Sequence, residues 1–406
     1  MSIELSNDRF SGYRWTPVSK IKGTLGPRVE KFLEITNWDA LTRRASKERN
    51  GMECKLLPDI GAGWNHLIRI LEFVDQVQWV ARLQMPHKFS DDHEPTMRWG
   101  KVEREYMTIR LVQEKSRLPV PKVYVCEDDP QSSVGVPFMF MECLKGNAGI
   151  DLCWDIPPEH KLKIYTALAE AQVELFRIGL PKIGMIIGRN EDGSYQLGPI
   201  PGIGGPFDTA TEYFKAWSAT AEYCLSLEEA RQNAGADAEE LLSSASKFRT
   251  LINDHAEWLS VNNTGPFPLR HGDFGHNNVV FDDEYNMVGV IDWESTSAVP
   301  CVRSAEFPLC LSMTPPAIGP PCFYDENGYP KDADLRERLA DREHYIEIVK
   351  QIEEERGLTE GYTLSSALQD SRREHISYAM GMYRQGFLGF YSKLLEGVGS
   401  DEDSRL

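Results

Sequence analysis

Apolar positions recur at helical spacing over several long stretches of the chain. Residues 29–50, 159–178 and 209–260 carry apolar side chains three and four positions apart, which predicts amphipathic helices. Two further helical segments begin near Ala333 and Leu364. In the last segment the same spacing predicts one broad apolar helix face, formed by Ile376, Met380, Tyr383, Phe387, Phe390 and Leu394.

Shorter apolar runs predict strands. The runs 67–71 and 78–83 are separated by a polar turn and indicate a small antiparallel sheet, to which the apolar run 138–142 adds a strand. Residues 184–205 are rich in glycine and proline, which favours turns or a small hairpin over a helix. Helical segments thus precede and follow a small antiparallel sheet, an arrangement typical of the α+β class.

The amino-acid composition indicates which classes of partner the chain can bind. The chain has 406 residues, and 44 Lys plus Arg against 62 Asp plus Glu give a net charge of −18. This balance argues against nucleic acid and against an anionic membrane surface, and it would favour a cationic substrate unless it serves only to keep the protein soluble.

Cysteine usage and the two ends of the chain bear on location. The eight cysteines form no C-x-x-C pair, and residues 1–10 contain no apolar signal segment, so we expect free thiols and a cytoplasmic protein. At the other end, Ser404, Arg405 and Leu406 differ from the peroxisomal S-K-L address only by Arg for Lys. Peroxisomal import is the alternative location.

One stretch carries candidate chemistry. Asp273 and Asn278 stand five positions apart in the sequence HGDFGHNN, and Asp292 follows an apolar run in the sequence IDWE. The runs 278–281 and 287–291 flank turn-forming residues, so they predict a β-hairpin that presents Asn278 and Asp292 together. Transfer of a γ-phosphoryl group requires a carboxylate to accept a hydroxyl proton and hard oxygen ligands for Mg²⁺. Asp273 fits the first role, and Asn278 with Asp292 fits the second.

These motifs resemble those of the aminoglycoside phosphotransferase and choline kinase-like family. Protein kinases carry HRD and DFG, whereas this chain has Gly272 in place of the arginine and Trp293 with Glu294 after the metal-ligand aspartate, and it has no Ala-Pro-Glu tripeptide. The resemblance implies a bilobal protein-kinase-like fold with a small antiparallel-sheet N-lobe and a larger, mostly helical C-lobe. We expect a helical extension over residues 1–53, the N-lobe over 54–143 and the C-lobe over 144–406.

The resemblance also assigns the nucleotide site. It implies a phosphate-binding loop at Gly61, Gly63 and Asn65, where glycines let backbone amides approach phosphates. Arg82 takes the place of the usual phosphate-binding lysine and pairs with Glu105 on the next helix, although Glu103 is an alternative partner. Two hinge positions, Glu142 and Leu144, follow the strand that meets adenine.

The function implied is ATP- and Mg²⁺-dependent transfer of the γ-phosphate to a hydroxyl of a small molecule. Asp273 serves as the base, and His271 braces the catalytic loop through a hydrogen bond. Glu294 could assist a second metal, bind a substrate amine or pair with an arginine. Because Arg82 departs from lysine, a catalytically silent nucleotide-binding protein is the main alternative, and a protein kinase is a weaker one.

Overall fold

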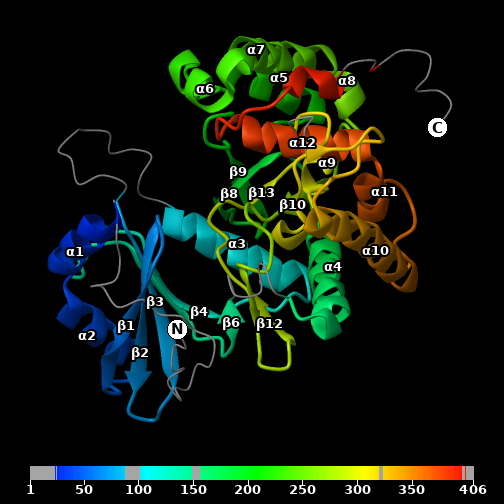
Figure 1. Ribbon diagram of the computed structural model, residues 1–406. Helices are drawn as coiled ribbons and strands as arrows, with labels where there is room; N and C mark the ends of the chain where they lie inside the picture. Colours follow the sequence, from blue (N-terminus) through cyan, green and yellow to red (C-terminus); the bar gives the residue numbers. More distant parts are fainter. Residues whose placement is uncertain are drawn as a thin grey trace. The chain divides into compact units, whose positions relative to one another are not determined.

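The computed structural model describes residues 25–86, 101–148, 156–319 and 323–395, together with Gly23 and Val398. These residues form two compact units. The first is drawn from residues 1–155, 186–196 and 276–295, and the second from 156–185, 197–275 and 296–406 (Figure 1). The tripeptide at 404–406 lies outside the described residues. None of the described helices is both long and apolar enough to cross a membrane.

An antiparallel sheet of five strands forms the centre of the first unit, in the order β1-β2-β3-β5-β4. Its strands are β1 (Cys54–Ala62), β2 (His66–Phe73), β3 (Gln78–Gln84), β4 (Val123–Glu127) and β5 (Phe138–Glu142). The predicted strand pair 67–71 and 78–83 is confirmed, with Leu67 opposite Leu83 and Ile68 opposite Arg82. Three helices complete this part of the unit: α1 (Leu25–Ile35), α2 (Trp38–Glu48) and α3 (Lys101–Lys115).

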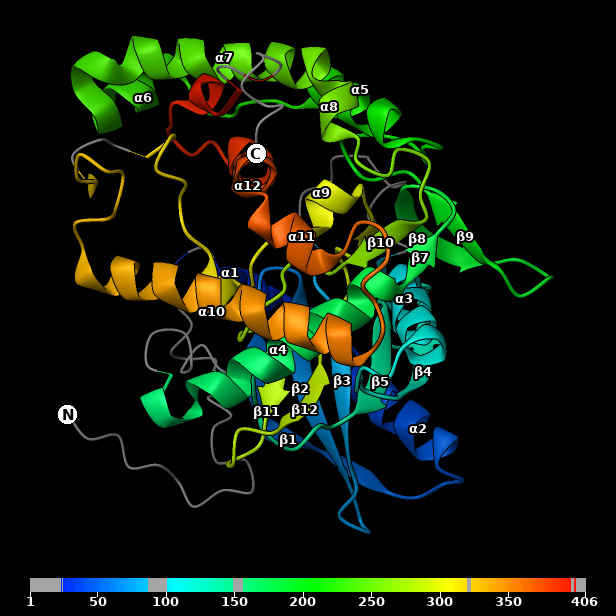
Figure 2. The same ribbon diagram turned by 90° about the vertical axis from the view of Figure 1, so that its right-hand side faces the viewer.

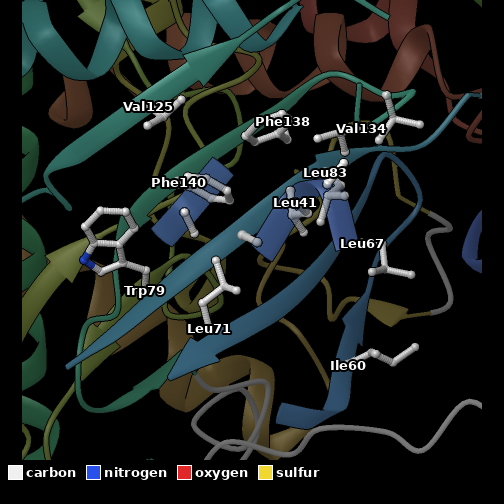
Figure 3. Packing of buried hydrophobic residues seen from close by; sticks show 14 of the residues in the cluster. Leu41, Ile60, Leu67, Leu71, Trp79, Leu83, Val125, Val134, Phe138 and Phe140 are labelled. Carbon is white, nitrogen blue, oxygen red and sulfur yellow. The ribbon is translucent and has the colours of Figure 1, made fainter. Parts of the chain in front are cut away.

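The two faces of this sheet differ in chemistry because strand side chains alternate. On one face, Trp79, Ala81 and Leu83 of β3 join the hydrophobic core beneath the N-terminal helices (Figure 3). Figure 3 shows Leu41 of α2 among these sheet residues. On the opposite face, β3 presents Val80 and Arg82. The buried core on one side therefore fixes the register that aims Arg82 at the other.

The predicted hairpin forms a second sheet within the first unit. Strands β11 (Val279–Phe281) and β12 (Met287–Val290) pair antiparallel, and β6 (Asn147–Ala148) adds to the outer side of β11. The first unit thus extends past the expected N-lobe boundary at residue 143 and takes in the hairpin, which we expected in the C-lobe. Gly289 contributes to this arrangement, since an added Cβ would lie 2.6 Å from Leu144 Cδ1.

The second unit is mainly helical. Its helices are α4 (Lys161–Arg177), α5 (Ala210–Thr220), α6 (Leu227–Ala234), α7 (Ala238–Asp254), α8 (Ala256–Leu259), α9 (Cys301–Ser304), α10 (Ala333–Glu355), α11 (Leu364–Gln369) and α12 (Ser371–Tyr383). Figure 2 shows α10 lying along α4, and the two helices pack together through Tyr165 and Tyr345. The helices predicted over 159–178 and 209–260 are confirmed, as is the α+β fold class.

A small sheet accompanies these helices, in the order β7-β10-β13-β8-β9. Its strands are β7 (Gly179–Leu180), β8 (Gly184–Arg189), β9 (Tyr195–Gly198), β10 (Phe267–Arg270) and β13 (Ser297–Ala298). The hairpin β8–β9 confirms the non-helical prediction for residues 184–205. Strand β10 matters for the site because it leads directly into His271.

The predicted apolar face at the C-terminus is wrong beyond Tyr383. Helix α12 ends there, Gly386 adopts a left-handed φ of 74°, and Phe387 is 56% exposed. A left-handed glycine stops an α-helix, so apolar residues further on cannot continue the same helix face. Leu394 instead belongs to a separate 3₁₀ turn, Tyr391–Leu395.

Candidate active site

The turn between β1 and β2 is tied to the acidic residue that follows the predicted metal ligand. Asn65 Nδ2 donates to Oε1 of Glu294 at 2.5 Å, and His66 Nδ1 lies 3.7 Å from Oε2 of the same carboxylate. The Gly63 N–H donates to the His66 carbonyl at 2.9 Å and closes the turn. Gly61 lies just before this turn, within β1. The three predicted loop residues therefore occupy alternate positions along the end of β1 and the turn that follows it.

The fold does not require glycine at position 63. A Cβ added there would come no closer than 3.9 Å to the His66 carbonyl oxygen, and the residue does not adopt a left-handed φ. Glycine is normally retained where φ is positive or where another group must approach the backbone closely. Gly63 has no positive φ, so of these two reasons only the second applies: without a side chain, the backbone at position 63 can be approached closely by another group, such as a ligand.

Arg82 connects two predicted site residues within the first unit. Its Nε donates to Glu105 Oε2 at 3.1 Å, and its Nη2 donates to Asp292 Oδ1 at 2.6 Å. Glu105 also accepts the Trp293 N–H through Oε1, at 3.2 Å. Glu105 is thus the partner of Arg82, whereas Glu103 is exposed. One buried guanidinium holds the helix carboxylate and the predicted metal ligand together.

The electrostatics of this cluster leave an excess of negative charge. Burial raises the pKa of Glu105 to about 7, although Arg82 opposes that shift. Burial also works against the charge on Arg82, but Glu105, Asp292 and Glu294 raise its pKa above the ordinary value. Arg82 therefore remains a cation, and three carboxylates share it.

The hairpin β11–β12 positions the two predicted metal ligands. The Ile291 N–H donates to the Asn278 carbonyl at 2.9 Å, so Asn278 and Ile291 are fixed side by side immediately before Asp292. Asp292 has a left-handed φ of 67°, a conformation that costs about 1–3 kcal/mol outside glycine and clusters at functional sites. The hairpin therefore holds the predicted ligand in a strained conformation.

The donor chemistry at these positions fits Mg²⁺. In the described ranges no three His, Cys, Asp or Glu side chains converge into a ready-made metal site. The predicted set instead combines one amide oxygen and one carboxylate, with the acidic side chain of Glu294 two positions further on. Mg²⁺ prefers hard oxygen donors and is commonly held by one or two carboxylates together with substrate phosphates. Asn278 and Asp292 would hold it in that manner.

An apolar pocket adjoins Arg82 and contains both predicted hinge residues. Its walls come from both sheets of the first unit and from the chain after β5, and its volume is about 70 Å³. The apolar lining residues are Ile68, Val80, Pro121, Met141, Leu144, Val280 and Ile291. Glu142 lies at the exposed edge, where its carboxylate accepts the Lys122 N–H at 3.2 Å. The lining is that of a small apolar slot beside the Arg82 cluster.

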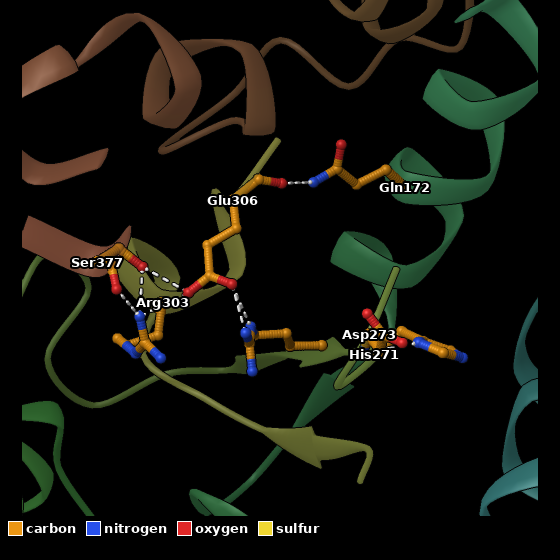
Figure 4. A network of polar contacts seen from close by, with 7 residues as sticks. Gln172, His271, Asp273, Arg303, Glu306 and Ser377 are labelled. Atoms are coloured by element: carbon orange, nitrogen blue, oxygen red, sulfur yellow. Dashed lines mark hydrogen bonds and ion pairs between the residues drawn. The ribbon is translucent and has the colours of Figure 1, made fainter. Parts of the chain in front are cut away.

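The second unit holds Asp273 at the end of β10. Asp273 is exposed, and its N–H donates to Nδ1 of the buried His271 at 3.2 Å. The His271 ring lies edge-on to Phe274, with ring centroids 6.2 Å apart. Figure 4 shows His271 and Asp273 next to each other at this turn. His271 thus fixes the loop by a short-range bond, while Asp273 keeps an accessible carboxylate.

A network of arginines and one glutamate lies behind this loop. Glu306 accepts a bond from Arg270, which immediately precedes His271, and a second at 2.6 Å from the buried Arg303. Ser377 Oγ donates to Glu306 at 3.0 Å, and Gln172 Nε2 donates to the Glu306 carbonyl at 2.7 Å (Figure 4). Glu306 therefore links β10 to α4, α9 and α12 and fixes the strand that carries Asp273.

Asp273 also lines a cavity of about 350 Å³. The cavity lies within the second unit, between α4, the end of β10, the segment 304–312 and α12. Its volume falls in the range of small-molecule sites. A nucleophile placed there would lie beside a carboxylate capable of accepting a proton.

Residues 78–300 match the profile described as "Phosphotransferase enzyme family", which covers more than half of the chain. The chain belongs to this family. The matched range begins in β3 and ends after β13, so it contains the Arg82 cluster, the hairpin and Asp273. The family resemblance drawn from the sequence is thereby confirmed.

The chain is also similar to parts of two curated proteins. The chain is 26% identical over 240 residues to "Clavilactone A biosynthesis cluster protein Y" of Ampulloclitocybe clavipes, covering 55% of this chain and 56% of that protein. It is 31% identical over 196 residues to "Probable acyl-CoA dehydrogenase IBR3" of Arabidopsis thaliana, covering 48% of this chain and 20% of that protein. The phosphotransferase chain thus spans about half of the first relative and a fifth of the second.

Two solved structures are similar to this chain at low sequence identity. A putative aminoglycoside phosphotransferase from Ralstonia eutropha is 14% identical with a TM-score of 0.49, covering 89% of this chain and 98% of the other. A putative fructosamine-3-kinase from Thermobifida fusca is 16% identical with a TM-score of 0.45, covering 88% and 98% respectively.

Sequence reasoning missed the residues that support Asp273. Arg270, Glu306 and Arg303 were not singled out, although Arg303 and Glu306 are opposite charges three positions apart among mostly apolar neighbours, a pattern that can indicate a paired buried charge. His66 was also missed. It lies one position after the predicted loop and contacts Glu294, which was left with several possible roles.

Proposed function

We propose that this phosphotransferase transfers the γ-phosphate of ATP to a hydroxyl group of a small molecule in a Mg²⁺-dependent reaction. The observation that carries the proposal is the bridge from Arg82 to both Glu105 and Asp292. In this fold the nucleotide phosphates are bound by a cation that carboxylates hold in place. Arg82 is such a cation, held between the helix carboxylate of Glu105 and the strained Asp292. Structural ion pairing alone would not account for the strained backbone of Asp292.

The remaining roles follow from the arrangement within each unit. The apolar pocket with Glu142 and Leu144 would take the adenine ring, and the turn at Gly61, Gly63 and Asn65, where glycines leave the backbone uncovered, would lie against the phosphates. Arg82, once oriented by Glu105, would donate to phosphate oxygens. Asn278 and Asp292 would hold Mg²⁺, which when bound supplies charge neutralisation at the phosphates.

Asp273 would serve as the base. Its carboxylate accepts the proton of the acceptor hydroxyl as the acceptor oxygen forms a bond to the γ-phosphorus and the bond to the β,γ-bridging oxygen breaks. The products are a phosphate monoester and ADP. His271 would keep the loop in position through its bond to the Asp273 N–H, without taking part in proton transfer.

A second candidate rests on a specific contact. Arg82 Nη2 lies 2.6 Å from an oxygen of the predicted metal ligand Asp292, so the arginine competes with Mg²⁺ for that carboxylate. A protein in which this contact persists would bind nucleotide and remain catalytically silent. A location in the cytoplasm remains our expectation for either function.

The test is Mg²⁺-dependent ADP formation by the purified protein with a panel of hydroxylated small molecules, compared with Asp273→Ala. We expect turnover with at least one acceptor, and its loss in the variant. Nucleotide binding without turnover across the panel would favour the silent protein.

A further inference from the structure

The cavity beside Asp273 offers a basis for judging the acceptor, since charged side chains in its wall determine which ligands it tolerates. Besides Asp273, the lining carboxylates are Glu306 and Glu374. Glu306 is already bonded by Arg270 and Arg303. Two guanidinium groups therefore offset this one carboxylate, and a cationic ligand would gain little from it.

Glu374 is compensated in a similar way. Its Oε2 lies 2.8 Å from Nη2 of Arg342, which is itself buried and stacked 3.8 Å from the Phe307 ring centroid. His375 Nε2 lies 3.7 Å from the same oxygen. Burial raises the pKa of Glu374 to about 7 and lowers the pKa of His375 to about 4. At neutral pH this carboxyl is partly protonated and the adjacent imidazole is uncharged.

The rest of the wall combines polar groups, among them Gln172, Arg270 and His271, with many apolar and aromatic side chains. The apolar and aromatic lining side chains are Leu175, Phe176, Leu269, Phe274, Phe307, Leu309, Tyr378 and Met382. Leu309 is 43% exposed, and Phe176, Phe274 and Met382 are half-buried, so apolar surface remains to be covered. Covering such surface contributes about 25 cal/mol per Å². The uncharged polar groups Ser312 and Gln385 could orient a hydroxyl or carbonyl of the ligand.

A polyamine such as an aminoglycoside would be poorly accommodated here. Asp273 has to face the acceptor hydroxyl, so an ammonium group elsewhere on the ligand would lose its hydration and find only carboxylates that arginines already occupy, which makes burial of the charge costly. An anionic acceptor would in turn face Asp273. Resting on the proposed phosphotransferase function, we propose that the acceptor is an uncharged alcohol with an aromatic or alicyclic body.

Three compounds with one skeleton test this inference: 1,4-benzenedimethanol, 4-(aminomethyl)benzyl alcohol and 4-(hydroxymethyl)benzoate. They are uncharged, cationic and anionic respectively, and each presents a benzylic hydroxyl. Binding would be followed by ligand-observed NMR and transfer by ADP release, both with the full chain. We expect the uncharged compound to exceed each charged one by about tenfold in affinity and in kcat/KM.

A variant that adds a charge to the cavity wall allows the compounds to be compared by the ratio of their affinities, whatever the absolute affinities are. Gln385 is exposed at the cavity wall, and Gln385→Glu adds an uncompensated carboxylate there without changing size. It should shift the ratio of cationic to uncharged binding by about fivefold toward the amine, while the uncharged control Gln385→Met should not.

The outcomes separate the two proposals. Preference for the cationic or anionic compound, binding of none of the three, or an unchanged ratio in Gln385→Glu would overturn the inference about the acceptor. Preferential binding of the uncharged compound with no transfer to any acceptor would leave that inference intact and count against phosphotransfer.

Discussion

The two acidic clusters of the molecule differ in how their charges are balanced. In the first unit, Glu105, Asp292 and Glu294 share Arg82. In the second unit, Glu306 is matched by two arginines, and Glu374 by Arg342. On our proposal the first cluster binds a divalent cation, whereas the carboxylates of the second hold the structure around Asp273. Similar residue types would thus serve binding in one place and support in the other.

Among the substitutions that test this difference between the two clusters, Asp292→Asn should have the largest effect. Asp292→Asn replaces a predicted carboxylate ligand by a neutral amide and removes one of the two charges that hold Arg82, so Mg²⁺-dependent nucleotide affinity should fall about 100-fold. Titration with a fluorescent ATP analogue, with and without Mg²⁺, measures this. Asp283→Asn, in the turn of the same hairpin, is the matched control and should bind as the wild type does. Equal affinities for the Asp292 variant and this control would remove Asp292 from the metal site.

The opposite behaviour is expected at Glu306. Glu306→Gln leaves Arg270 and the buried Arg303 without their carboxylate, and the free energy of unfolding should fall by about 1–3 kcal/mol. Urea denaturation measures this loss, with the exposed Glu326→Gln as control. Nucleotide affinity should not change, because Glu306 lies in the second unit. A loss of nucleotide affinity with full stability would break the comparison.

Two variants of helix α3 distinguish Glu105 from Glu103 as the residue that orients Arg82. Glu105→Gln should raise KM for ATP about tenfold, because the ion pair that orients the guanidinium is replaced by a weaker bond to a neutral amide oxygen. Glu103→Gln changes an exposed acid two positions away and should leave KM unchanged. Steady-state kinetics of the pair decides between them, and equal effects would mean that charge on the helix matters rather than the contact.

The smallest effect concerns pH. Glu374 has a native pKa of about 7 against an ordinary value of 4.5, so the native state holds its proton through a window in which the unfolded state has lost it. The free energy of unfolding should therefore decrease as pH rises from about 4.5 to 7, by at least about 1 kcal/mol from this residue. Glu374→Gln should flatten that part of the curve and leave the contribution of Glu105. A wild-type slope in the variant would show that Glu374 is not the group responsible.

Sequence reasoning succeeded where the determining contacts are local or ordered along the chain. The hairpin that carries Asn278 and Asp292 was predicted because its strands and turn lie within fifteen residues. The pairing of Arg82 with a helix glutamate followed from the order of the motifs, but spacing alone could not choose between Glu103 and Glu105. That choice depends on how helix α3 is rotated against β3, which packing determines.

Long-range contacts account for what was missed. The hairpin belongs to the first unit because β11 pairs with β6, which lies more than a hundred residues earlier in the chain. No local sequence pattern predicts this pairing. The support of Asp273 by Glu306 and Arg270 likewise depends on packing between α4, α9 and α12. The left-handed φ of Asp292 was not visible in sequence, since aspartate is not restricted to that conformation.

The central claim is that the first unit binds the Mg²⁺–nucleotide and that Asp273 of the second supplies the base. The most direct test compares Asp273→Ala and Asp292→Ala for both Mg²⁺–ATP binding and single-turnover phosphate transfer to an accepted alcohol. The account predicts that Asp273→Ala binds nucleotide as the wild type does and transfers at least about 1,000-fold more slowly, whereas Asp292→Ala loses both. Transfer by Asp273→Ala at the wild-type rate would contradict it.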